Sequence, residues 1–88
     1  MSREELLDWC EEGTAVLDPE TYDRAIVGVS TDGRLVYDYD ELVNVLMEDM
    51  TSEEAMDFLD YNTLRAIPYM GEKAPIIMRR IDWEVTNE

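Results

Sequence analysis

Negative charge is the feature of this sequence that most limits what it can fold into. The 88 residues contain 22 Asp and Glu against 7 Lys and Arg and no His, a net charge of −15. Residues 1–63 hold 18 of the acids and 3 of the bases, whereas residues 64–88 are neutral. Such self-repulsion destabilises a small domain unless salt or a basic partner screens it. The charge therefore favours an acidic surface that binds a basic molecule.

Length and apolar content predict one folded domain over residues 1–88. Apolar residues make up 45% of the chain, well above the level of a disordered acidic tail. A core of this size is small, so burial of more apolar surface in a homodimer would stabilise it. Cys10 is the single cysteine, and no apolar run is long enough to span a membrane. We therefore expect a cytoplasmic protein with no membrane contact.

A β-hairpin is predicted by period-two alternation on both sides of a turn. The residues before and after Thr31-Asp32-Gly33 alternate between apolar and other types. A three-residue loop with Gly33 in the left-handed region pairs Val29 with Leu35 and Val27 with Tyr37. This register places all four of these side chains on one face of the sheet.

Three helices and a last strand complete the expected fold. Capping-box spacings begin helices at residue 3, at residue 39 and at residue 52, and we expect these helices to end near residues 12, 48 and 65. Residues 75–85 alternate as a strand, with Arg79 breaking the pattern as at a bulge. The order α-β-β-α-α-β predicts an α+β fold with a three-stranded antiparallel sheet and helices on one face.

Two of the predicted helices carry regular acidic stripes. Glu4, Asp8 and Glu11 recur at i, i+4 and i+7, and Glu53, Asp57 and Asp60 repeat that spacing. Side chains so placed are neighbours on one helix face, where like charges repel. Such a row of anions can imitate a nucleic-acid backbone. A solubilising acidic face and adaptation to high salt are the alternative explanations.

Other chemistries have less support in the sequence. Asp38, Asp40 and Glu41 crowd together, but helix capping explains Asp38 and Glu41, and the calcium-binding loop pattern of the EF-hand is not met. Without His there is no Ser-His-Asp or Cys-His arrangement, and Cys10 has no neighbouring cation to activate it. We expect no catalytic residues, no metal site and no cofactor, and Cys10 is interpreted as a core residue.

Four segments carry a resemblance to a known group of proteins. Residues 37–40, 50–55, 60–69 and 74–78 read YDYD, MTSEEA, DYNTLRAIPY and APIIM. In these segments the chain resembles small acidic proteins of phages and prophages of Gram-positive bacteria. The resemblance implies a mobile-element setting, in which small acidic proteins such as anti-CRISPR proteins inhibit host nucleases. It supplies no catalytic or ligand-binding residues.

The leading hypothesis is a non-catalytic inhibitor that mimics nucleic acid and blocks a basic groove on a host defence or nucleic-acid-processing protein. Exposed Tyr61 would add an apolar contact, and nucleic acid itself would not be bound. The predicted partner-binding residues are Glu4, Asp8, Glu11, Asp38, Asp40, Glu41, Glu53, Asp57, Asp60 and Tyr61. A homo-oligomeric phage regulatory or structural component and an acidic cation-binding module are the alternatives.

Overall fold

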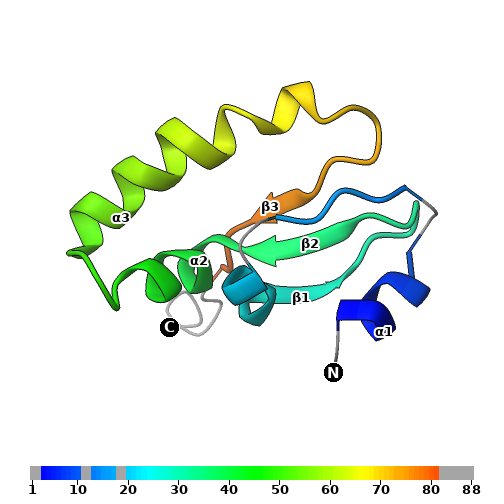
Figure 1. The fold of residues 1–88 in the computed structure, drawn as a ribbon, viewed down its shortest axis with the longest axis horizontal. Helices are drawn as coiled ribbons and strands as arrows, with labels where there is room; N and C mark the ends of the chain where they lie inside the picture. Colours follow the sequence, from blue (N-terminus) through cyan, green and yellow to red (C-terminus); the bar gives the residue numbers. More distant parts are fainter. Residues whose placement is uncertain (1–2, 11–12, 18–19, 82–88) are drawn as a thin grey trace, which may run out of the picture.

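The computed structural model describes residues 3–10, 13–17 and 20–81, and it has an α+β fold (Figure 1). A short helix opens the chain, a hairpin follows, and a helical segment connects the hairpin to a third strand. The elements are α1 (Arg3–Asp8), the 3₁₀ helix η1 (Glu20–Ala25), β1 (Ile26–Val29), β2 (Leu35–Asp38), α2 (Tyr39–Leu46), α3 (Ser52–Phe58), the π-helix η2 (Leu59–Leu64), the 3₁₀ helix η3 (Ile67–Tyr69) and β3 (Ile76–Met78).

The turn of the hairpin has the predicted form. Gly33 has φ +85°, and hydrogen bonds between Ser30 and Arg34 close a three-residue loop. Val29 lies opposite Leu35 as predicted, but Tyr37 pairs with Ile26 instead of Val27 because β1 is irregular between Ile26 and Gly28. An extra residue in one strand shifts the pairing beyond it.

The four side chains that were predicted to share one face of the hairpin differ in burial. Leu35 and Tyr37 are fully buried, whereas Val27 and Val29 are 41% and 36% exposed. The reason is the position of the strands, since β1 lies at an edge of the sheet and β2 at its centre. A central strand is covered from more directions than an edge strand.

The expected antiparallel sheet is mixed. The order is β1-β2-β3, with β1 antiparallel to β2 and β2 parallel to β3. Between β2 and β3 the chain runs through α2, α3, η2 and η3, so both strands point the same way in Figure 1. A crossover of this length lets strands pair in parallel, and local sequence signals do not fix that direction.

The helical segment begins and turns at clear caps. The Asp38 carboxylate accepts a hydrogen bond from the backbone N–H of Asp40 and caps α2. Thr51 and Glu54 form the predicted capping box at the start of α3. After α3 the helix continues as η2, whose i→i+5 hydrogen bonds widen the turn. In this segment Thr63 is buried, whereas Asn62 is exposed.

The ends of the chain are less regular than expected. α1 ends at Asp8, before the predicted residue 12, and residues 11 and 12 lie outside the described part. β3 ends at Met78, so Arg79 is not a bulge within a strand, and the predicted strand residues 82–85 lie outside the described part. Cys10 is half-buried against the core, and its thiol donates to the Leu6 carbonyl.

The core joins the sheet to the helical segment. Tyr37 on β2, Leu42 on α2 and Leu59 on η2 are fully buried, and η1 packs against α2. The Tyr37 hydroxyl accepts a 3.0 Å hydrogen bond from the backbone N–H of Leu17. At the far end of the hairpin, Arg34 donates a 2.9 Å hydrogen bond to the Ala74 carbonyl and so holds the chain that leads into β3. These contacts fix the helical segment against the sheet.

Candidate interaction surface

An acidic surface lies along the exposed side of α3 and η2. The capping box at Thr51 begins the helix, and Glu53 and Glu54 lie in its first turn. Carboxylates at this position interact favourably with the positive end of the helix dipole. Asp57 and Asp60 follow, and both are exposed. We call Glu53, Asp57, Asp60 and Tyr61 the α3–η2 surface. No ion pair is found for its three carboxylates among the described residues.

The sequence predicted one straight stripe for these acids, and the π-helix changes their arrangement. Asp57 belongs to α3 with 3.6 residues per turn, whereas Asp60 belongs to η2 with a wider turn. Asp57, Asp60 and Tyr61 nevertheless line one shallow hollow of about 580 Å³, which also includes Phe58 and Arg65. The structure therefore brings three of the predicted site residues together.

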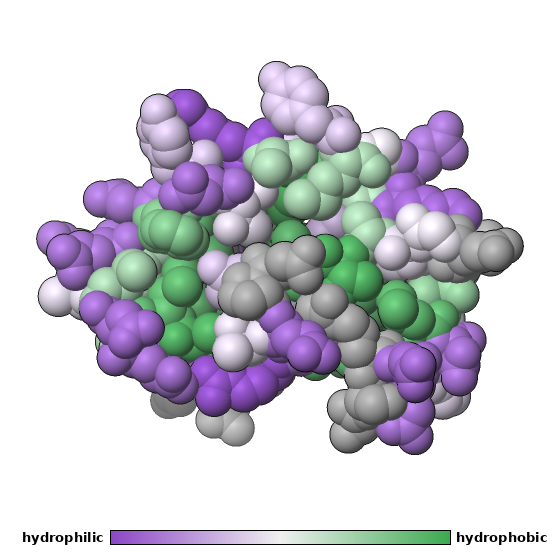
Figure 2. Space-filling view, viewed as in Figure 1, coloured by the Kyte–Doolittle hydropathy of each residue, from purple (hydrophilic) through white to green (hydrophobic). Residues whose placement is uncertain are grey.

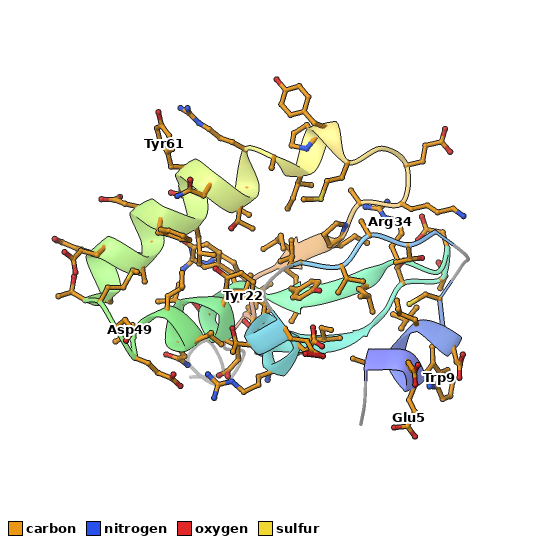
Figure 3. The ribbon with its side chains drawn as sticks, viewed as in Figure 1. Glu5, Trp9, Tyr22, Arg34, Asp49 and Tyr61 are labelled. Atoms are coloured by element: carbon orange, nitrogen blue, oxygen red, sulfur yellow. The ribbon has the colours of Figure 1, made fainter. Side chains whose placement is uncertain are left out.

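Tyr61 projects outward from the helix, as Figure 3 shows. Its side chain is 69% exposed, and the Arg65 guanidinium lies 4.8 Å from its ring centre. Phe58, one turn earlier, is 40% exposed. The pairing of Arg65 with Tyr61 was not predicted from the sequence, although their i, i+4 spacing is a signal for such a contact.

The acids at the start of α2 have different environments. Asp40 and Glu41 are exposed, with Arg79 lying 3.8 Å from Asp40 Oδ1 and Asn44 donating to Glu41. Asp38 is only 3% exposed, and its Oδ2 accepts a 2.7 Å hydrogen bond from Arg80. The prediction that Asp38 belongs to a docking surface is wrong, because its carboxylate is buried and already satisfied.

The acidic residues of α1 do not join this surface. Glu4 and Asp8 are exposed, but α1 lies at the opposite end of the molecule from α3 (Figure 1). Figure 3 shows the same separation between Glu5 on α1 and Tyr61 on η2. Glu11 lies outside the described residues. The two predicted stripes therefore cannot form one continuous docking face.

The negative field reaches the interior at Tyr39. This ring is 8% exposed at the start of α2, and burial is the first cause that raises its pKa. The carboxylates of Asp60, Asp40 and Asp57 raise the pKa further, while Arg79 opposes them. Three carboxylates from different elements thus raise the pKa of the Tyr39 hydroxyl, and one guanidinium lowers it.

A second hollow lies beside the α3–η2 surface. This groove of about 560 Å³ is lined by Tyr39, Asp60, Arg79 and apolar residues of η2, η3 and β3. The Arg79 guanidinium lies 5.0 Å from the centre of the Tyr39 ring. Asp60 lines both hollows and therefore stands between the Tyr61 side and the apolar groove.

A third hollow lies at the other end of the molecule. Leu6 and Trp9 face Ile26, Val27 and Val29 of the edge strand across about 460 Å³, and Trp9 is 70% exposed. Figure 2 shows hydrophobic side chains exposed between hydrophilic ones on one face of the molecule. Trp9, Val27 and Val29 are therefore available to a partner as apolar contacts.

Within residues 3–10, 13–17 and 20–81, no three His, Cys, Asp or Glu side chains are grouped closely enough to hold a metal ion. In the same part of the chain, no helix combines the length and apolar character that crossing a bilayer requires. Burial raises the pKa of the Cys10 thiol, which keeps it protonated and a poor nucleophile.

No family model, curated protein or solved structure matches this chain.

Proposed function

We propose that this chain is a non-catalytic inhibitor of the phage or prophage type, which mimics nucleic acid through the α3–η2 surface. It would occupy a basic groove on a host defence or nucleic-acid-processing protein and exclude the nucleic acid. The supporting observation is that Glu53, Asp57 and Asp60 are exposed along one helical segment without an ion pair in the described part of the chain. Asp40 and Glu41 extend the same acidic end of the molecule.

The charge balance supports this proposal over a solubilising coat. An ordinary exposed helix face alternates charges of opposite sign. Neither α3 nor η2 contains a Lys or Arg. The first base is Arg65, directly after η2, and its guanidinium lies over the Tyr61 ring. The carboxylates would therefore pair with the Lys and Arg of a partner, while Tyr61 supplies the aromatic anchor common in protein interfaces.

Two double variants with equal charge change test the proposal. Wild-type protein is immobilised and used to capture proteins from a Gram-positive host lysate at low salt, and the captured protein is then purified. Displacement of a labelled oligonucleotide from that protein is measured with Glu53→Lys/Asp57→Lys and with Glu4→Lys/Asp8→Lys. We expect the first variant to lose displacement and the second to retain it, because Glu4 and Asp8 lie at the far end of the molecule.

Salt supplies a second readout in the same assay. Displacement by the wild-type protein should weaken steeply as ionic strength rises, because exposed charges are screened within about 10 Å at 0.1 M salt. Equal loss in both double variants would mean that overall charge acts, and the α3–η2 surface would be excluded as the docking site. Circular dichroism of both variants checks that they remain folded.

The apolar hollow between α1 and β1 supports a second candidate function, a homo-oligomeric component. β1 is an edge strand, and Trp9, Val27 and Val29 beside it are exposed. Edge strands with apolar side chains are surfaces on which chains pair. Light scattering at millimolar protein should then show a dimer that Trp9→Ala weakens, and a monomer at that concentration would exclude this function.

A further inference from the structure

The groove between the π-helical segment and β3 combines two kinds of surface. Leu64, Ile67 and Ile77 supply apolar walls, and the Asp60 carboxylate lies at one side. Its volume of about 560 Å³ lies in the range of pockets that hold small ligands, so it has room for one side chain of a partner. η3 is the yellow segment at the upper right of Figure 1, and β3 is the orange strand near the centre, beside β2.

This combination matches a side chain that is apolar along its length and cationic at its end. Lys and Arg lay their methylene groups on apolar surface and extend the charge toward a carboxylate or water. Asp60 has no ion pair among the described residues, so its oxygens are available to an incoming cation. The carboxylates of Asp57 and Asp40 act on the same region, as their effect on Tyr39 shows.

The groove already holds one guanidinium at its rim. Arg79 stacks on Tyr39 at 5.0 Å and lies 3.8 Å from Asp40, and its side chain remains 69% exposed. An aromatic ring and a carboxylate at this site therefore suit the planar guanidinium group. Arg also binds carboxylates through two parallel hydrogen bonds and is less strongly hydrated than Lys.

We propose that this groove receives an arginine side chain of a basic protein partner, with the guanidinium on Asp60 and the methylene groups on Leu64 and Ile67. The inference rests on the proposed function and names the contact by which the acidic surface holds its target. It also separates a shaped site from general attraction between opposite charges.

A capped, fluorescein-labelled hexa-arginine peptide is the probe, measured by anisotropy at low salt against capped hexa-lysine. We expect the arginine peptide to bind at least threefold more tightly. Asp60→Asn should weaken it by about tenfold, the loss of one charge-assisted hydrogen bond. Glu53→Gln removes the same charge from α3 outside the groove lining and should weaken it by less than threefold.

Two further pairs of variants separate apolar packing and local charge from net charge. Ile67→Ala should weaken the arginine peptide several-fold, while Met56→Ala, at an exposed apolar position on α3 outside the groove lining, should not. Arg79→Ala removes the cation that lines the groove and should tighten binding more than Arg24→Ala does. Arg24 is a suitable control because it pairs with Glu48 at 3.0 Å, outside the groove lining.

Methyl NMR locates the peptide directly. The methyl signals of Leu64, Ile67 and Ile77 should shift on titration with the arginine peptide. Equal effects of Asp60→Asn and Glu53→Gln, equal affinity for both peptides, or unshifted groove methyls would each overturn the inference. If any of these three results is found while Glu53→Lys/Asp57→Lys still abolishes oligonucleotide displacement, the proposed function stands without this groove. Peptide binding in the groove without displacement by the wild-type protein would reject the function instead.

Discussion

Removal of the Asp38 carboxylate should destabilise the fold more than removal of any exposed acid. Its Oδ1 accepts the backbone N–H of Asp40 at 3.0 Å, and its Oδ2 accepts Arg80 Nε at 2.7 Å. The Asp38 side chain is 4% exposed, whereas that of Arg80 is 64% exposed. One carboxylate thus caps α2 and also fastens the chain that follows β3.

The two contacts can be given separate magnitudes. Loss of an N-cap carboxylate to Ala costs about 1 kcal/mol of unfolding free energy. The contact with Arg80 adds up to about 1 kcal/mol, since solvent screens the exposed guanidinium. Asp38→Ala should therefore cost roughly 1.5–2 kcal/mol, which in a domain of this size lowers Tm by roughly 10 °C. Asp38→Asn keeps a cap and should lose only the Arg80 contact, about as much as Arg80→Ala.

Urea denaturation followed by circular dichroism measures all three variants and the Asp38→Ala/Arg80→Ala double variant. The double variant should be less destabilised than the sum of the two single changes, because both remove the same contact. Glu41→Ala is the matched control at an exposed position of α2. If Asp38→Ala changed the unfolding free energy by less than about 0.5 kcal/mol, the assigned cap and ion pair would carry no stability.

The remaining predictions concern the turn, the core and alkaline pH. Gly33→Ala should lower the free energy of unfolding, measured by urea denaturation, by about 1 kcal/mol because φ of Gly33 is +85°. Gly28→Ala should leave it nearly unchanged, since a Cβ there meets nothing within 4 Å. Equal losses in the two variants would refute the turn assignment. Tyr37→Phe should cost about 1–3 kcal/mol because it leaves a buried backbone N–H without its acceptor, and an unchanged urea midpoint would contradict this. The pKa values of Tyr22 and Tyr39 are both raised, chiefly by burial, so their contribution to stability is complete below the ordinary tyrosine pKa of about 10 and is lost as pH rises through their folded values. The urea midpoint should fall above pH 10, and Tyr39→Phe should reduce that fall.

Local chemistry explains which parts of the fold the sequence predicts well. The left-handed Gly33 loop and the Thr51–Glu54 capping box depend on residues within a few positions of one another. Each is confirmed because its hydrogen bonds close within that short segment. The α+β class follows from the same local signals.

The candidate site was predicted in part. Asp57, Asp60 and Tyr61 come together as expected, because they lie within one helical segment. Asp38 is buried and is bound by Arg80, which lies 42 residues later in the chain, so this contact could not be predicted from near neighbours. The apolar groove beside Asp60 was not predicted, because β3 reaches it only through the tertiary fold.

The sequence alone determined the hairpin turn, the starts of α2 and α3, and the strong negative charge of residues 1–63, since these depend on composition and near neighbours. Tertiary structure alone decided that β3 runs parallel to β2, that β1 leaves Val27 exposed, and that α1 stands apart from α3. The physical reason is that such arrangements depend on contacts between distant segments, whose free energy depends on the packing of the whole chain and not on any one segment.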